Sequence, residues 1–300
     1  MQPPLLQPIV HPTATAHGVR LLLWRDDLLH PDLPGNKARK LKYNLQQART
    51  EGHSRLLTFG GAYSNHLAAV AAAGRLYGFA TTGLVRGEAH HHLNPTLARC
   101  AADGMALHYL DRTTYRRRAE PEFLADMQQQ FGPAYLLPEG GTNALALDGV
   151  AELIAELRQH TNFDAVAVAA GTGGTLAGLT LGLAEAGYPA RAVGVAALKG
   201  GDFLRAEVDV LTLAATGVAL PNYELHTGYH FGGYAKLPAE LRTFIQNFEA
   251  TYGVLLDPIY TGKLLFGVLD LIAQGHFAPG STIVAVHTGG LQAWGGFGKE

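Results

Sequence analysis

The sequence predicts an α/β fold, with open, twisted parallel sheets that carry helices on both faces. Short apolar runs suited to buried strands alternate with longer helical runs along most of the 300 residues. Three of these strands run into glycine-rich turns, at residues 60–66, 171–175 and 287–290. Such alternation is typical of parallel sheets covered by helices, and ligands bind at turns of this kind, beyond the carboxyl ends of the strands.

Two sheets are expected, one in each of two domains, because a chain of this length usually forms two. The small domain, residues 43–150, is predicted to hold strands at residues 55–59, 81–85, 105–110 and 134–137. The large domain, residues 1–42 and 151–300, is predicted to hold strands at residues 19–24, 165–170, 190–197 and 282–286. Polar connections are expected at residues 88–95 and 110–121, and a crossing between the domains at residues 138–143.

Length and composition agree with a soluble protein. Hydrophobic residues make up 47% of the chain, enough for sizeable cores, and the formal net charge of -2 gives no electrostatic case for binding nucleic acid. Cys100 is the single cysteine, which rules out a disulfide framework within the chain. No apolar run of about 18 residues is free of charges, and the first residues lack a cationic leader. We therefore expect a cytoplasmic protein without a membrane partner.

Residues 35–40 place Lys37 at a junction between a glycine-led loop and a helix. The positive end of a helix dipole favours a neutral amine, and the neighbouring charges of Arg39 and Lys40 act in the same direction. A neutral lysine is a nucleophile that forms a Schiff base with an aldehyde. Lys37 is therefore a candidate to hold pyridoxal phosphate (PLP). The alternative is a solvated basic helix face without chemistry.

A second candidate site is a phosphate-binding turn. The apolar strand at residues 165–170 leads directly into Gly171, Thr172, Gly173, Gly174 and Thr175, and a helical run follows. Glycines allow close approach of the backbone to an anion, helix N-terminal amides point at it, and threonine hydroxyls complete the shell. The turn lacks the Gly-Lys-Ser/Thr ending of a nucleoside triphosphate-binding loop. It also lacks the three-glycine spacing of a dinucleotide-binding fingerprint, so a single phosphate suits it better. The alternative is an ordinary tight connection.

The turn at residues 60–66 is a candidate anchor for a substrate carboxylate. Ser64 and Asn65 suit the start of the small-residue helix that follows, and the amides there would bind an anion. Ser64 can cap the helix whether or not it also binds substrate. His90, His91 and His92 are adjacent, so they cannot all face one ion, and we predict a surface loop and no metal.

Eight ordered segments, spread over nearly the whole chain, resemble one family. They are residues 24–27, 35–41, 64–66, 138–143, 171–175, 233–234, 257–263 and 287–290. The family comprises 1-aminocyclopropane-1-carboxylate (ACC) deaminases and D-cysteine desulfhydrases, PLP enzymes with the tryptophan synthase β-like fold, also called fold type II. The resemblance implies PLP in a cleft between the two domains, a small amino acid as substrate, and a homodimer.

The resemblance assigns roles to individual residues. On the cofactor side, Lys37 matches the Schiff-base lysine, residues 171–175 match the phosphate cup, and Asn65 matches a residue beside the cofactor ring. On the substrate side, the matches are Ser64 and His66 near the carboxylate, together with the two active-site tyrosines, Tyr234 and Tyr260. These tyrosines are candidates for guiding proton transfer or the leaving sulfur.

Two positions separate the branches of this family. ACC deaminases resemble one another in having glutamate and leucine where this chain has Thr261 and Thr288, and the desulfhydrase pattern has hydroxyl residues at both. A carboxylate near the pyridine nitrogen keeps the ring a strong electron sink, whereas a hydroxyl makes a weaker one. A weaker sink suits β-elimination, because a good leaving group consumes the carbanion quickly. We therefore favour elimination from a D-amino acid such as D-cysteine, giving pyruvate, ammonia and sulfide.

Three alternatives stay open. One is ACC deaminase activity, a hydrolytic deamination that yields α-ketobutyrate and ammonia, and another is a racemase or dehydratase acting on serine-like substrates. The third is a phosphate-binding protein without catalysis. The chain also departs from the family, because it is short, residues 60–65 are compressed with Tyr63 in place of a glutamine, and residues 67–69 lack an Arg-Gln pair. These departures from the family pattern leave the identity of the substrate open.

Overall fold

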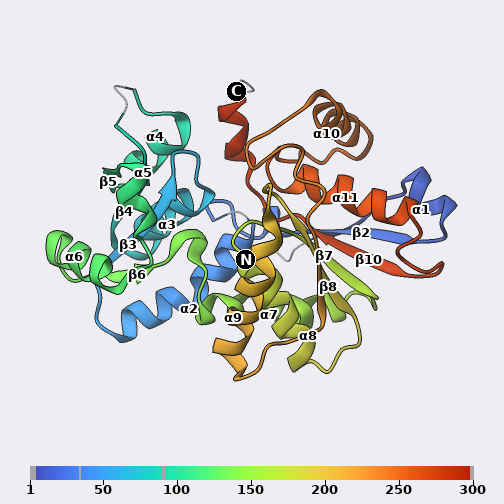
Figure 1. Ribbon diagram of the computed structural model, residues 1–300, viewed down its shortest axis with the longest axis horizontal. Coiled ribbons are helices and arrows are strands. Elements are labelled where there is room, and N and C mark those ends of the chain that lie inside the picture. The colour runs from blue at the N-terminus through green and yellow to red at the C-terminus, as the bar shows by residue number, and fades with distance from the viewer. Residues whose placement is uncertain (1–4, 34, 90–91, 298–300) are drawn as a thin grey trace. The chain divides into compact units, whose positions relative to one another are not determined.

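The computed structural model describes residues 5–33, 35–89 and 92–297 (Figure 1). The chain divides into a large unit, Met1–Arg39 with Asn143–Leu291, and a small unit, Lys40–Thr142 with Gln292–Glu300. The division falls three residues before the expected boundary at 42/43 and eight residues before the one at 150/151. It also places the residues after Leu291, which were expected in the large domain, in the small unit. The reason at the second boundary is that the helix beginning at Ala144 packs into the large unit along its whole length. His90 and His91 lie outside the described residues.

The large unit is built on a six-stranded sheet in the order β1-β2-β10-β7-β8-β9. Its strands are β1 (Leu5–Pro8), β2 (Arg20–Arg25), β7 (Ala165–Ala170), β8 (Arg191–Ala196), β9 (Tyr223–His226) and β10 (Thr282–Val286). All neighbours pair in parallel except β1 with β2, which is antiparallel. The four predicted strands are confirmed. The two edge strands were not predicted, because each has only four residues, too few for a clear periodicity.

Helices cover both faces of this sheet (Figure 1). One face is covered by three helices, α7 (Ala144–Arg158), α8 (Gly174–Glu185) and α9 (Leu204–Thr216). The other face is covered by α11 (Thr261–Ala273), with α1 (Pro12–Ala16) and α10 (Ala239–Tyr252) packed against it. Short 3-10 turns lie at Asp26–Leu28 and Gly201–Phe203.

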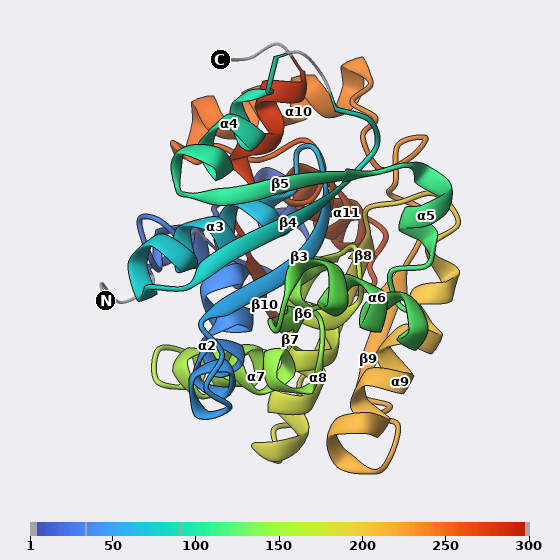
Figure 2. The same cartoon turned by 90° about the vertical axis from the view of Figure 1, so that its left-hand side faces the viewer.

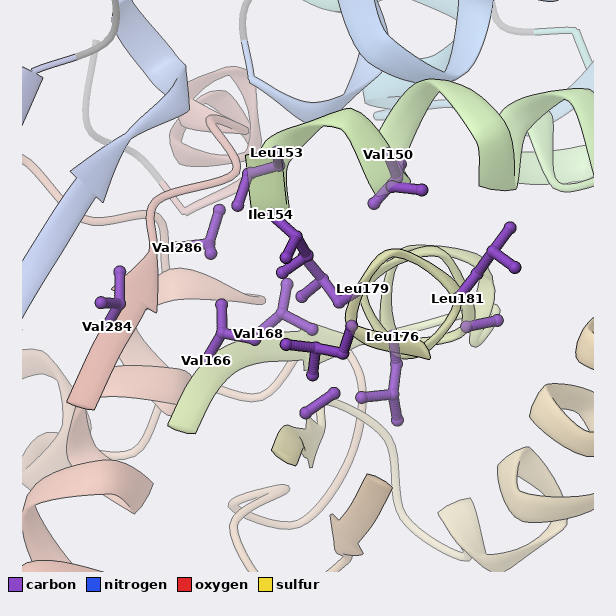
Figure 3. Close-up of a cluster of buried hydrophobic side chains, with 14 of the residues drawn as sticks. Val150, Leu153, Ile154, Val166, Val168, Leu176, Leu179, Leu181, Val284 and Val286 are labelled. Atoms are coloured by element: carbon purple, nitrogen blue, oxygen red, sulfur yellow. The ribbon is translucent and has the colours of Figure 1, made fainter. Parts of the chain in front are cut away.

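The core of the large unit explains why α8 is apolar on almost every side. Leu176 and Leu179 of α8, Val168 of β7, and Val150 and Ile154 of α7 belong to one cluster of buried side chains (Figure 3). Gly178 of α8 allows the close approach of α7, since a Cβ there would lie 2.6 Å from Val150 Cβ. The sheet and its helices therefore pack as one rigid support for the turn at residues 171–175.

The small unit has a four-stranded parallel sheet in the order β5-β4-β3-β6 (Figure 2). Its strands are β3 (Arg55–Gly61), β4 (Ala80–Arg86), β5 (Met105–Leu110) and β6 (Tyr135–Leu137), all as predicted. Its helices are α2 (Asn36–Thr50), which begins in the large unit, α3 (Asn65–Tyr77), α4 (Pro95–Ala102), α5 (Arg112–Arg116) and α6 (Pro121–Phe131).

The two faces of the small sheet are covered by different helices. On one face Phe123 and Met127 of α6 and Tyr115 of α5 pack against Phe59 of β3. On the other face α3 and α4 pack against β3, β4 and β5. The polar connection expected at residues 110–121 contains the short helix α5, which was not predicted. Asp111 caps this helix through its carboxylate. Within the described residues, no helix is both long and apolar enough to cross a membrane.

Candidate active site

One edge of the large sheet gathers three of the predicted segments. Parallel pairing sets Val286 of β10 beside Trp24 of β2, and Ala170 of β7 beside Ala196 of β8. The carboxyl ends of these strands therefore share one edge, where open α/β sheets bind ligands. The start of α2, the turn at 171–175 and the turn at 287–290 all follow these ends.

Hydrogen bonds from Asn36 join these three segments directly. Its Nδ2 donates to Thr175 Oγ1 at 2.8 Å, and its backbone N donates to Thr288 O at 3.4 Å. Asn36 is the first residue of α2 and directly precedes Lys37, so these two contacts fix the position of the Lys37 backbone. The sequence motifs are thus brought together by one hydrogen bond between side chains and one between backbone groups, which no single motif reveals.

Lys37 lies in the first turn of α2 and its side chain is half-buried. Burial lowers the pKa of Lys37 from an ordinary 10.5 to about 8, so the neutral amine is accessible near neutral pH. The expected push from Arg39 is not the cause. Arg39 is held in ion pairs with Asp26 at 2.9 Å and Glu156 at 2.7 Å, which neutralise its charge.

Gly35 lets the loop pass close to the turn after β10. It has a φ of +70°, and a Cβ on it would lie 1.8 Å from Thr288 O, so no side chain fits. We expect Gly35→Ala to lower the free energy of unfolding by about 3 kcal/mol or more, since a clash adds to the left-handed strain of ~1–2 kcal/mol. Urea unfolding measures the loss.

Gly52 supplies a matched control for this prediction. It has a similar φ of +76°, but nothing lies within 4 Å of a Cβ built there. Gly52→Ala should therefore cost only the strain, about 1–2 kcal/mol. Equal losses in the two variants would contradict the role of the Gly35 contact.

The turn at residues 171–175 has the geometry of an anion cradle. Gly173 has a φ of +78° and is the N-cap of α8, whose first-turn N–H groups are not used by the helix itself. At Gly171 a Cβ would lie 3.0 Å from the ring of Tyr260, so only glycine leaves this space open. At Gly173, in contrast, a Cβ would point at Val208 of α9. The two glycines therefore act differently, Gly171 through open space and Gly173 through backbone conformation.

The two predicted tyrosines form a pair beside this turn. The hydroxyls of Tyr234 and Tyr260 lie 2.7 Å apart, and their rings meet edge to face. Tyr234 is 41% exposed, so the pair is open to solvent on one side. A hydrogen-bonded pair of phenols next to the glycine turn can pass a proton along one bond.

Asp257 was not among the predicted site residues, but it organises the segment that carries Tyr260. It is fully buried, and its carboxylate accepts from the backbone N of Ile259, Tyr260 and Thr261. Burial raises the pKa of Asp257, and these hydrogen bonds oppose the rise. The signal in the sequence was Asp-Pro directly before a helical run, which is typical of a helix start.

The Thr261 hydroxyl is engaged with Asp257. It donates to Asp257 Oδ2 at 2.6 Å and accepts from Asp257 N at 2.8 Å. Its hydrogen is thus committed to the cap of α11, and only an acceptor lone pair is left for a ligand. The proposed role of Thr261 toward a cofactor ring stays a prediction, and it would have to use that lone pair.

Lys263 is a buried cation that ties together three chain segments. Its Nζ donates to the carbonyls of Ala197, His230, Gly233 and Tyr234, at 2.8–3.1 Å. Burial lowers its pKa to about 8, against the opposing charge of Asp257. Because two of these carbonyls belong to Gly233 and Tyr234, Lys263 holds the loop that presents the tyrosine. Beyond the family motif, no local pattern in the sequence indicates this role.

Ser64, Asn65 and His66 lie in the small unit. The Ser64 hydroxyl accepts from Leu67 N at 3.2 Å and so caps α3, as predicted. His66 is 2% exposed, and its Nε2 lies 2.8 Å from Thr58 Oγ1. Since the Thr58 hydroxyl donates to Leu137 O, it must accept from His66 Nε2–H. A substrate role for His66 stays a prediction.

Asn65 carries a polar atom whose environment suggests a ligand. Its Oδ1 is buried and accepts no hydrogen bond from any residue that the structure describes. Buried acceptors are nearly always paired, so such an atom calls for an explanation. A bound group that donates to Asn65 would supply one.

Two curated relatives cover almost the full chain. A putative 1-aminocyclopropane-1-carboxylate deaminase of Pyrococcus furiosus is 31% identical over 293 residues, which cover 94% of this chain and 88% of that protein. A D-cysteine desulfhydrase of Yersinia pestis is also 31% identical, over 295 residues, covering 92% of this chain and 88% of the relative. The percentage identity to these two relatives is therefore the same.

Solved structures and a family description agree with these relatives. A crystal structure of an ACC deaminase homologue matches with a TM-score of 0.85 and 29% identity, covering 98% of this chain and 91% of the other. A hydrogen sulfide-producing enzyme from Fusobacterium nucleatum, at 14% identity and a TM-score of 0.70, shares the fold. The family described as pyridoxal-phosphate dependent enzymes matches residues 6–289. The chain therefore belongs to the PLP-dependent enzymes of fold type II, in the family of ACC deaminases and D-cysteine desulfhydrases.

Proposed function

We propose that this enzyme catalyses β-elimination from D-cysteine, giving pyruvate, ammonia and sulfide. The observation that carries the proposal is the residue at position 261, a threonine whose buried hydroxyl is bonded to Asp257. Position 261 thus supplies no carboxylate to keep a pyridine nitrogen charged. A ring that is a weaker electron sink suits the loss of a good leaving group such as thiolate.

The residues present fit PLP. Lys37 has a pKa lowered to about 8, and the 171–175 turn ends at a helix N-terminus. Asn65 Oδ1 is a buried acceptor to which no described residue donates a hydrogen bond. We propose that Lys37 holds the cofactor, that Gly171, Thr172, Gly173, Gly174 and Thr175 hold its phosphate, and that Asn65, Thr261 and Thr288 lie near its ring. When bound, PLP withdraws electrons from the substrate's Cα and so makes its proton acidic.

The chain's own residues carry the proton steps. The Lys37 amine accepts the Cα proton, which its lowered pKa permits at neutral pH. The Cβ–S bond breaks, and the sulfur takes its electron pair. The Tyr234–Tyr260 pair donates a proton to the sulfur along the 2.7 Å hydrogen bond. One water is consumed overall, and its oxygen becomes the keto oxygen of pyruvate.

A direct test is to incubate the purified holoenzyme with D-cysteine, L-cysteine, D-serine and ACC, and to measure sulfide and keto acid in each. We expect sulfide and pyruvate from D-cysteine at a higher rate than α-ketobutyrate from ACC. Efficient turnover of ACC with D-cysteine untouched would replace the proposal with the deaminase, the second candidate that the relatives support. Reaction with D-serine alone would indicate a dehydratase.

Thr288 allows a test of the hydroxyl argument that leaves the Asp257 cap intact. Thr288→Val removes the hydroxyl at nearly constant shape, whereas Thr288→Ser keeps it. We expect Val, but not Ser, to lower the rate of sulfide release relative to α-ketobutyrate formation, by roughly 5–10-fold for one lost hydrogen bond of about 1 kcal/mol. Equal ratios in wild type and both variants would remove Thr288 from the specificity argument.

We further propose that Ser64, Asn65 and His66 act on the substrate side, with Ser64 and Asn65 at the N-terminus of α3 binding the substrate carboxylate. Ser64→Ala should then raise KM as well as lower stability by about 1 kcal/mol through loss of the cap. Asp111→Ala is a matched control, because Asp111 caps α5 in the same unit. A KM increase of the same size in both variants would show that Ser64 only caps the helix and does not bind substrate.

A homodimer is the remaining part of this proposal, and it rests on the family resemblance alone. Size-exclusion chromatography with light scattering on the holoenzyme measures the number of chains in the assembly. A mass near 31.9 kDa, that of one chain, would contradict the dimer.

A further inference from the structure

Three ligand-type side chains converge on the large unit, away from the residues discussed so far. Glu224 and His226 lie two residues apart on edge strand β9, so their side chains point to the same face. His276 follows the end of α11. Tyr260 and Thr261 lie at the opposite end of that helix, about 20 Å away for 13 residues. This cluster is therefore separate from the proposed active site.

The ligand atoms lie close to the spacing that a tetrahedral metal ion requires. Glu224 Oε1 lies 3.3 Å from His226 Nε2 and 2.8 Å from His276 Nε2. One ligand atom from each residue lies within 4.8 Å of the other two. Bonds of about 2.0–2.1 Å in tetrahedral geometry separate ligand atoms by ~3.3 Å. Small side-chain adjustments would therefore place all three around one ion.

Neighbouring groups hold the three side chains in this orientation. Arg191 lies 3.3 Å from the other carboxylate oxygen, Glu224 Oε2, which leaves Oε1 toward the histidines. The His276 ring packs at right angles on Phe277, and the two histidine rings also meet at nearly 90°. The side chains are 21–30% exposed, so an ion can reach them from solvent. Groups that orient ligands in this way are typical of metal sites.

We propose that Glu224, His226 and His276 bind one divalent transition-metal ion of the zinc class, with water completing the coordination. Two imidazoles and a carboxylate suit Zn²⁺, whereas Ca²⁺ and Mg²⁺ prefer oxygen ligands alone. The ion would connect edge strand β9 to the end of α11 and stabilise the large unit. The competing explanation is a pair of ordinary histidine–carboxylate hydrogen bonds.

Metal binding is tested on tag-free holoenzyme after treatment with a chelator and desalting. Zn²⁺ is titrated in competition with a chromophoric chelator, and thermal unfolding is followed with and without Zn²⁺. We expect one high-affinity ion per chain and a higher unfolding temperature. His226→Ala, His276→Ala and Glu224→Gln should each weaken binding about 10-fold or more and abolish the thermal shift. Absorption of bound Co²⁺ in the visible region should report tetrahedral geometry.

Two controls separate this cluster from other histidines. His53→Ala removes a single histidine–carboxylate pair, with Glu51 at 3.3 Å, and should leave Zn²⁺ binding unchanged. A variant with alanine at positions 90, 91 and 92 tests the adjacent histidines. The proposal is overturned if wild type takes up no Zn²⁺ at micromolar concentration, or if binding survives in the three cluster variants and is lost in either control.

Discussion

Replacing Lys37 with alanine is expected to abolish both turnover and the visible absorption of the lysine-bound cofactor. Loss of the amine removes the covalent attachment of PLP and the group that accepts the Cα proton. The lost proton transfer alone accounts for roughly 10²–10⁴-fold in rate. PLP should still bind weakly through the 171–175 turn, so equilibrium dialysis should detect it without the visible band.

Lys42→Ala is the matched control, because Lys42 is an exposed lysine on the same helix. It should keep colour and activity. Borohydride reduction followed by peptide mapping should place the pyridoxyl group on Lys37. Its recovery on Lys40, Lys199 or Lys263 would overturn the assignment.

The pKa of Lys37 gives this prediction a pH dependence. Only the neutral amine attacks the aldehyde, and burial lowers the pKa of Lys37 to about 8 in the protein without cofactor. The rate at which the apoenzyme takes up PLP should therefore rise with pH, with a midpoint near 8. A midpoint near the ordinary value of 10.5 would show that the amine is not buried as the structure has it.

Replacing Lys263 with methionine should destabilise the enzyme and release the loop that carries Tyr234. Four backbone carbonyls lose their shared cationic donor, and the fully buried Asp257 loses a compensating charge. We expect the free energy of unfolding to fall by about 3 kcal/mol or more. Amides in residues 230–236 should exchange hydrogen faster, and kcat should fall because the Tyr234–Tyr260 hydrogen bond is no longer held.

Lys199→Met is the control for this substitution. Lys199 is exposed and lies two residues from Ala197, on the same connection after β8. It should change neither stability nor exchange in residues 230–236. If Lys263→Met lost stability while exchange in that loop and kcat stayed at wild-type values, Lys263 would serve the fold and not the position of Tyr234.

Much of the fold was accessible from the sequence. Apolar runs such as 165–170 and 282–286 are continuous because their strands are buried on both faces, and they were confirmed as β7 and β10. Short edge strands β1 and β9 were missed, since four residues carry too little periodicity. Helix α5 was missed because it has only five residues, with Tyr115 as the single buried one, and because its start depends on the Asp111 cap.

The residues of the candidate site likewise divide into those that the sequence predicts and those that only the structure reveals. Lys37, the 171–175 turn and the two tyrosines could be proposed from local chemistry and from the family pattern. The contacts of Asp257, Lys263 and Asn36 could not, because each joins groups far apart in the chain or hidden by burial. The Glu224, His226 and His276 cluster also escaped, since its third member is 50 residues from the second in the sequence.

By itself, the sequence determined the fold class, the order of most strands, the PLP family and the segments that carry its chemistry. These follow from local properties, namely periodicity, turn composition and motif order. The tertiary structure alone decided why Lys37 has a lowered pKa, to which group the Thr261 hydroxyl donates, and what Lys263 holds. Burial and hydrogen-bond partners depend on which segments the folded chain brings together, and no local pattern records them.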